Sequence, residues 1–181
     1  ESFIGTLWRC LTISESHRAT QDRRLAARDC AHIVPKMSRK PNTELRRGWT
    51  TGACATAATK AALIRLWGGA FADEISITLP KGETPEFPLA HTDAGVDWAE
   101  VGITKDAGDD PDVTHGALII ARVRVSPGGV IFCAGEGVGT VTMPGLPIGP
   151  GEPAINPVPR QMMTQVVQDV AAHYGQNADV E

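Results

Sequence analysis

Apolar residues recur with a regular period from residue 45 onward. The stretch from residue 50 to residue 67 predicts a helix that has Thr50 or Thr51 as its N-cap and Gly68 and Gly69 as its stop. One side of this helix carries the residues Ala53, Ala57, Ala61 and Ile64. Because small side chains allow a close approach, the pattern predicts a helix that packs tightly against a sheet or a neighbouring backbone.

Alternating apolar and polar residues predict strands in the middle of the chain. The predicted strands are residues 75–79, 96–103 and 117–125. In the last of them Arg122 and Arg124 alternate with apolar neighbours, so one face is buried and the other is polar in its second half. Turn residues 126–129 and the apolar residues 130–134 after them predict a hairpin.

A second amphipathic helix is predicted near the end of the chain, over residues 160–174, with Pro157 and Pro159 just before its start. Its apolar residues at helical spacing are Met162, Met163, Val166, Val167, Val170, Ala171 and Tyr174. Helices among several strands indicate an α+β fold, with a mixed β-sheet and helices packed on a face.

Residues 1–44 show no sustained period and lead into this domain through a polar run at 37–43, so we expect a flexible N-terminal extension followed by one domain over residues 45–181. Residues 1–47 hold ten Lys and Arg but only five acids. The basic residues are scattered and have no aromatic residues between them, so nucleic-acid binding is not expected.

Composition favours one soluble domain. The chain has 181 residues, 42% hydrophobic and 21% charged, which is enough to close a core. We expect no membrane segment and no signal peptide, and therefore a cytoplasmic protein. The cysteines are far apart, and the pair Cys30 and His32 is too small for a tetrahedral shell, so neither a disulfide framework nor a metal site is expected. The cysteines are Cys10, Cys30, Cys54 and Cys133.

The entry to the first helix, residues 46–54, could bind an anion. Free amides at a helix N-terminus attract negative charge, and Arg46, Arg47, Thr50 and Thr51 add donors. A carboxylate or a phosphate would fit there. Simple capping of the helix needs only one threonine and stays open as the alternative.

An acidic segment lies at residues 105–115, with aspartates at positions 106, 109, 110 and 112. These carboxylates could coordinate a hard cation, supply a general base or bind a cationic ligand. The alternative is a solvated turn in which Asp112 caps the residues after it. A metal-dependent phosphotransfer enzyme is disfavoured, because the sequence has no phosphate loop that ends in Lys-Ser or Lys-Thr.

Two glycine- and proline-rich segments come before the last helix. Residues 135–146 superficially resemble a Rossmann glycine loop, but β-branched residues and prolines come after the glycines, so we expect an irregular loop that lets a ligand approach the backbone. Residues 149–160 bring Asn156 and Arg160 to the entrance of the last helix. A cap at Asn156 with a surface arginine is the alternative there.

In their order along the chain, residues 45–58, 105–116, 135–140 and 151–160 resemble the cobalt-precorrin-5B C(1)-methyltransferase (CbiD) family, and the resemblance covers about residues 45 to 174. It implies a CbiD-like fold that is not a Rossmann methyltransferase. It also implies transfer of a methyl group from S-adenosylmethionine to carbon 1 of cobalt-precorrin-5B, a polycarboxylate tetrapyrrole, to give cobalt-precorrin-6A in cobalamin biosynthesis.

The chemistry that the resemblance implies suits particular residues of this sequence. We predict catalytic roles for Asp106, Asp109 and Asp110, with His115 as a proton carrier, and substrate or cofactor binding by a larger set with no metal ligand. The binding set is Thr50, Thr51, Gly52, Cys54, Lys105, Gly135, Gly137, Gly139, Asn156 and Arg160.

The sequence departs from the family in length. Motifs of the family's C-terminal half are not found, and residues 1–44 match nothing in the family. The alternative function is therefore a truncated, catalytically silent module of the same fold that binds a tetrapyrrole or a partner subunit. A homo-oligomer is left open.

Overall fold

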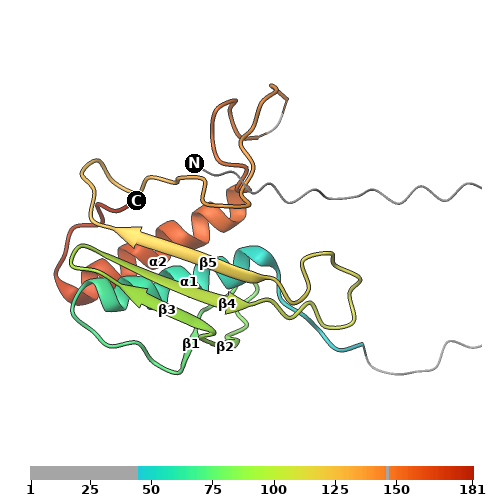
Figure 1. Cartoon of the computed structure of the whole chain (residues 1–181), viewed down its shortest axis with the longest axis horizontal. Coiled ribbons are helices and arrows are strands. Elements are labelled where there is room, and N and C mark those ends of the chain that lie inside the picture. The colour runs from blue at the N-terminus through green and yellow to red at the C-terminus, as the bar shows by residue number, and fades with distance from the viewer. Residues whose placement is uncertain (1–44, 146) are drawn as a thin grey trace, which may run out of the picture. The chain divides into compact units, whose positions relative to one another are not determined.

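The computed structural model describes residues 45–145 and 147–181. The predicted extension, and with it Cys10, Cys30 and His32, lies outside the described residues. The elements are α1 (Thr51–Leu66), β1 (Glu74–Ser76), β2 (Glu86–Pro88), β3 (His91–Ala94), β4 (Trp98–Thr104), β5 (Leu118–Arg124) and α2 (Pro157–Tyr174) (Figure 1).

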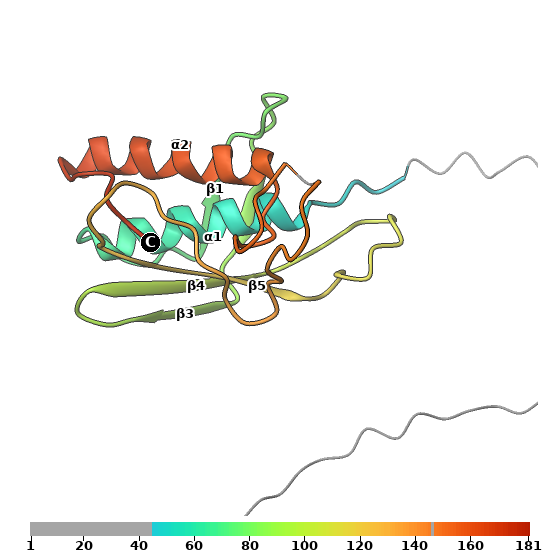
Figure 2. The ribbon, with the colours of Figure 1, turned by 90° about the horizontal axis from the view of Figure 1, so that it is seen from above.

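The described part of the chain has three layers. Strands β3, β4 and β5 form an antiparallel sheet in that order, and β1 and β2 form a separate antiparallel pair. Helix α1 lies between this three-stranded sheet and α2 (Figure 2). Because α1 has a neighbour on both sides, alanines around most of its circumference are buried, and Ala57, Ala58 and Ala62 are fully inaccessible. We predicted small side chains on one face of α1. The helix needs them on two faces, one against the sheet and one against α2.

Local signals set the limits of α1. The Thr50 hydroxyl accepts the Ala53 N–H at 3.1 Å, which confirms the predicted cap, and the helix ends at Leu66. Two buried threonines inside the helix are satisfied by it, since Thr56 donates to the Gly52 carbonyl and Thr59 to the Ala55 carbonyl. These bonds let polar side chains lie in the core without an unpaired hydroxyl.

The strand predictions are confirmed unevenly. The third predicted strand is β5 and the second is β4, while the first shortens to β1; strands β2 and β3 were not predicted. The alternation in β4 buries Ala99, Val101 and Ile103 against α1.

The predicted hairpin is wrong. Residues 130–134 do not pair with β5, because Val180 from the end of the chain takes that position and forms bridges to both Val125 and Val130. Val180 is only 2% exposed, so burial of its side chain favours this pairing over a local return of the chain.

Helix α2 begins at Pro157, earlier than predicted. Proline fits the first turn of a helix because its φ is preset and the missing N–H would have no partner there. The helix ends at Gly175, whose φ of 62° is left-handed. Neither α1 nor α2, the helices of the described residues, has the length and apolar character needed to cross a membrane.

The α+β class with helices on one face of a sheet is confirmed. All pairs between the named strands are antiparallel, so the mixed character that we expected is confined to one parallel bridge, Val130 with Val180.

Candidate functional site

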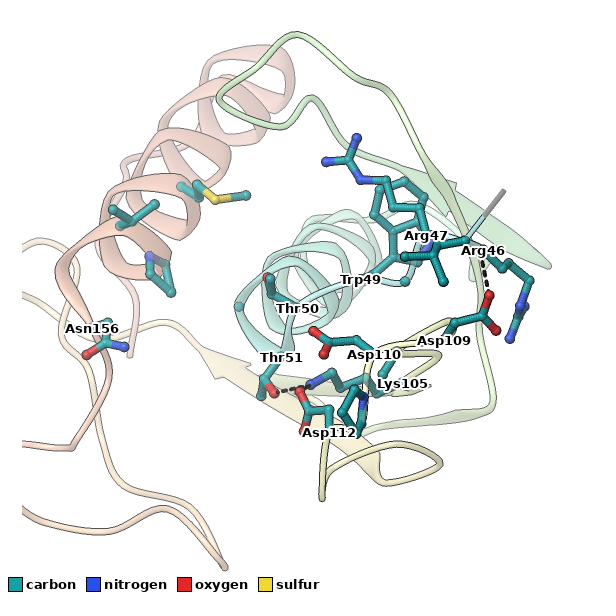
Figure 3. A pocket seen from close by; sticks show the side chains of 18 of the residues that line it. Arg46, Arg47, Trp49, Thr50, Thr51, Lys105, Asp109, Asp110, Asp112 and Asn156 are labelled. Carbon is teal, nitrogen blue, oxygen red and sulfur yellow. Dashed lines mark hydrogen bonds and ion pairs between the residues drawn. The ribbon is translucent and has the colours of Figure 1, made fainter. Parts of the chain in front are cut away.

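A cleft of about 1170 Å³ opens at the end of the fold where α1 and α2 both begin. Its walls come from residues 45–52, from residues 105–112 after β4, and from residues 156–162 (Figure 3). Ligand sites in proteins commonly enclose about 300–1,000 Å³, so this cleft is large enough for a sizeable ligand.

The two helix starts meet at this end but offer different chemistry. A Cβ on Gly52 would lie 2.5 Å from Pro159 Cγ, so the first turns of the helices touch. The amides of Thr51 and Gly52 have no acceptor among the described residues, which leaves α1 with free N–H groups that attract an anion. Helix α2 lacks two of these groups and lines the cleft with an apolar wall. The wall consists of Pro157, Val158, Pro159 and Met162.

The helix entry and the acidic segment are held together by their backbones. Trp49 donates its N–H to the Asp106 carbonyl at 2.7 Å, and Asp109 donates its own to the Arg46 carbonyl at 2.9 Å. Only glycine fits between them, because a Cβ on Gly48 would lie 1.8 Å from the Ala107 carbonyl carbon. Two segments far apart in the sequence therefore form one wall of the cleft.

Lys105 ties the start of α1 to the acidic segment. Its side chain is only 3% exposed, and its ammonium group donates to Thr51 Oγ1 at 3.2 Å, to Thr114 Oγ1 at 2.6 Å and to Asp112 Oδ2. A buried ammonium is stable only when its donors are used, and all three are used here. The Lys105 contact, and then that of Thr114, hold the pKa of Asp112 well below its usual range.

Two of the other aspartates are engaged in structural contacts. Asp106 accepts the Gly108 N–H at 2.9 Å and binds the Arg46 guanidinium through both oxygens at 2.6 and 2.8 Å. The Gly108 contact first, and then Arg46, lower the pKa of Asp106. Asp109 accepts the Arg46 N–H at 2.6 Å. Both carboxylates therefore hold the helix entry in place.

Asp110 differs from its neighbours. Its carboxylate lines the cleft and makes no hydrogen bond or ion pair with any described residue. Figure 3 shows it beside Thr51 and Lys105, with Asn156 on the other side of the cleft. Among the four aspartates, Asp110 is the one whose carboxylate has no hydrogen-bond or ion-pair partner among the described residues.

The acidic segment does not gather its carboxylates around one point. Within residues 45–145 and 147–181, no group of three His, Cys, Asp or Glu side chains is placed to hold a metal ion. Each of Asp106, Asp109 and Asp112 has its own protein partner, so the segment serves as a scaffold for the cleft.

His115 lies behind the cleft wall. Its Nδ1 accepts the Ala107 N–H at 3.1 Å and lies 3.9 Å from Asp106 Oδ1, and His115 is absent from the residues that line the cleft. With Nδ1 occupied as an acceptor, the ring supports the 106–108 turn.

Other predicted binding residues are spread over the molecule. Thr50, Thr51, Gly52, Lys105 and Asn156 line the cleft. Cys54 is fully buried in the core, and burial raises the pKa of its thiol. Gly135, Gly137 and Gly139 are exposed and lie outside the lining.

Asn156 and Arg160 behave differently at the start of α2. Asn156 occupies the N-cap position without a capping hydrogen bond from its side chain, so its amide group is open to the cleft. Arg160 donates to the carbonyls of Ile155 and Pro153 at 3.0 and 2.9 Å and pairs with Glu152 at 2.8 Å. It thereby fastens the preceding loop to the helix.

Sequence reasoning missed the apolar side of the cleft. Trp49 and the wall from Pro157 to Met162 were assigned no binding role, although they supply much of the lining. The prolines before the predicted helix were the available signal, since they indicate a helix start with few free N–H groups.

The chain is similar to proteins of one family along most of its length. The CbiD family model matches residues 38–181. A cobalt-precorrin-5B C(1)-methyltransferase of Brucella anthropi is 61% identical over 149 residues, which is 81% of this chain and 40% of that protein. The protein of the same name from Paramagnetospirillum magneticum is 58% identical over 139 residues, which is 76% of this chain and 39% of that protein.

A solved structure gives the same result. The crystal structure of the cobalamin biosynthesis protein CbiD from Archaeoglobus fulgidus matches with a TM-score of 0.54 and 28% identity, over 75% of this chain and 42% of that one. The chain thus spans about 40% of the length of the curated relatives that it matches.

Proposed function

Because the chain belongs to the CbiD family, we propose that it takes part in the methylation of carbon 1 of cobalt-precorrin-5B, with S-adenosylmethionine as the methyl donor. The product would be cobalt-precorrin-6A, in cobalamin biosynthesis. The observation that carries this proposal is the cleft, which combines free helix N–H groups on one side with an apolar wall on the other.

This combination suits a polycarboxylate tetrapyrrole. The macrocycle of such a substrate presents a broad, largely apolar face, and acetate and propionate groups surround it. The wall from Pro157 to Met162 and the indole of Trp49 would contact the ring face, while the amides of Thr51 and Gly52 would bind a carboxylate. Asn156 adds a neutral donor at the opposite side.

The methyl donor brings an activated methyl group as a sulfonium ion, so the protein mainly has to orient two ligands and exclude water. Asp110 fits this task because its carboxylate is unpaired among the described residues and faces the cleft. There it would balance a cationic ligand or accept a proton from the substrate. Asp106 and Asp109 would position the helix entry through Arg46.

Substrate binding can be tested at Asn156. An Asn156→Asp variant places a negative charge at the cleft, and aspartate at an N-cap stabilises a helix, so weaker binding could not be attributed to unfolding. We expect the affinity of this chain for cobalt-precorrin-5B, measured by fluorescence or calorimetry, to fall about tenfold. Unchanged affinity would place the carboxylate groups elsewhere.

The role of Asp110 is tested by isotopic methyl transfer in a full-length relative. Asp110→Asn at the equivalent position should lower turnover by about a hundredfold or more, the range for a positioned acid or base. Asp97→Asn is the matched control, since Asp97 is an exposed acid outside the cleft. If both variants keep full turnover, Asp110 has no part in the reaction.

The alternative is a module that binds the tetrapyrrole without methylating it. It is worth testing because the chain spans only about 40% of its relatives' length. This chain and a full-length relative would be assayed side by side for methyl transfer and for substrate binding. Methyl transfer by both would exclude the silent module, and binding without transfer by this chain would support it.

A further inference from the structure

Residues 179–181 pair with the end of β5. Arg124 and Glu181 exchange two backbone hydrogen bonds, at 2.9 and 3.0 Å, and Ser126 donates its N–H to the Asp179 carbonyl at 3.1 Å. Residues 179–181 therefore run antiparallel to β5, alongside its end. Figure 1 shows the C-terminus beside the arrowhead of β5.

The same residues are paired on their other side. Val180 donates its N–H to the Gly129 carbonyl at 3.1 Å and accepts the Ile131 N–H at 2.9 Å, which is the pattern of a parallel ladder. Val180 thus lies between β5 and residues 129–131. We call the backbone edge of β5 that faces away from β4, from Leu118 to Arg124, the β5 slot, and residues 179–181 pair with one end of it.

The rest of the slot has unpaired backbone groups along β5. In an antiparallel pair, residues that exchange both hydrogen bonds with one neighbour alternate with residues that face the other neighbour. Since Arg124 faces Glu181, the backbones of Arg122, Ile120 and Leu118 point in the same direction, away from β4. Among the described residues, no hydrogen bond reaches these three residues from that side.

The first residues of this edge, from Leu118 to Ala121, include no charged residue and no proline. Natural sheet edges are usually protected by lysine, proline or a covering segment. The start of β5 has instead Leu118 and Ile120, which are 45% and 50% exposed. On the inner face next to the slot, Ile119 and Ala121 of β5 are only partly buried, although they border the core.

We propose that the β5 slot binds an extended polypeptide strand that runs antiparallel to β5, in the direction that residues 179–181 already take. The occupant that fits is the stretch that comes after the equivalent of Glu181 in the longer relatives. This inference does not depend on the proposed methyl transfer.

The pairing fixes the register of the bound strand. Residues two, four and six places after Glu181 lie opposite Arg122, Ile120 and Leu118. Residues one, three and five places after it share the face of Val180, which is 2% exposed, so these positions should be apolar and cover the inner face. On its far side the strand pairs with residues 131–133, which gives the apolar segment 130–134 the strand partner that it lacks.

The test is backbone hydrogen exchange, followed by NMR, in this chain. The probe is a synthetic peptide of about eight residues, the length of a long strand, taken from the Brucella anthropi relative after the residue aligned with Glu181. We expect the amides of Leu118, Ile120 and Arg122 to exchange at least tenfold more slowly with the peptide bound. The amide of Cys133, on the far side of the bound strand, should also exchange more slowly. The amides of Ile119, Ala121 and Val123 face β4 and should not change.

A second peptide provides the control. It has the same composition, but the residues at odd and even positions are exchanged, so that its apolar side faces outward. It should give no protection. Because a free peptide binds weakly, the same residues are also fused after Glu181, which raises their effective concentration.

Three results would overturn the proposal. The first is unchanged exchange at Leu118, Ile120 and Arg122 in both the peptide and the fusion experiments. The second is equal protection by the control peptide. The third is protection of these amides in the chain alone: if it rises with protein concentration, a second copy occupies the edge, and if it does not, the chain's own residues do.

Discussion

Gly48→Ala should separate the two segments that form the cleft wall and lower the free energy of unfolding. The added Cβ would lie 1.8 Å from the Ala107 carbonyl carbon and 2.1 Å from its oxygen, so the two backbones must separate. Their separation breaks the hydrogen bonds from Trp49 to Asp106 and from Asp109 to Arg46. At about 1 kcal/mol net for each bond, the free energy of unfolding should fall by about 2 kcal/mol.

Thermal unfolding followed by circular dichroism measures this loss. For a domain of this size, about 2 kcal/mol corresponds to a fall in Tm of roughly 4–8 °C. Gly135→Ala is the matched control, because no heavy atom lies within 4 Å of the position that its Cβ would take. The control should unfold within about 1 °C of the unmodified chain.

Substrate binding by the folded Gly48→Ala variant distinguishes a local change in the cleft wall from a general loss of stability. If the two segments form the cleft wall together, Gly48→Ala should also weaken the binding of cobalt-precorrin-5B at temperatures where the chain is still folded. Equal melting temperatures for Gly48→Ala and Gly135→Ala would refute the reasoning, since they would mean that the backbones at Gly48 and Ala107 separate freely.

Three further predictions concern buried or paired groups. Lys105→Met should lower the midpoint of chemical denaturation, because it leaves Asp112 without its cation, and adding Asp112→Asn should restore part of the loss. Contacts with Lys105 and Thr114 lower the pKa of Asp112, so its stabilising contribution is complete above pH about 4 and is lost as the pH falls through the folded-state value. Asp112→Asn should therefore flatten the acid side of the stability profile, and an unchanged profile would contradict this. Burial raises the pKa of the Cys54 thiol, so alkylation followed by peptide mass spectrometry should modify exposed Cys133 much faster; equal rates would mean that the core opens readily.

The sequence determined the parts of the fold that depend on local signals. A threonine cap at Thr50 or Thr51, a glycine stop after residue 67 and the alternation in β5 each act through neighbours within a few residues. The structure confirms the stop and the alternation, and it places the cap at Thr50. The segments that meet at the cleft could also be named in advance, because helix starts and acidic turns have recognisable compositions.

Only the tertiary structure decided which of these residues are free to act. The four aspartates look alike in the sequence. In the structure Arg46 contacts Asp106 and Asp109, and Lys105 contacts Asp112, so only the carboxylate of Asp110 is without a partner among the described residues. Burial of Lys105 requires α1, β4 and the acidic segment together.

The hairpin shows the same division between local and distant effects. Residues 126–134 have every local feature of a turn and a returning strand, yet Val180 takes the place beside β5. A local pattern reports which residues prefer to be extended or buried. It does not report which distant segment will satisfy that preference, because the choice depends on the free energy of burial, and that is settled only when the whole core is assembled.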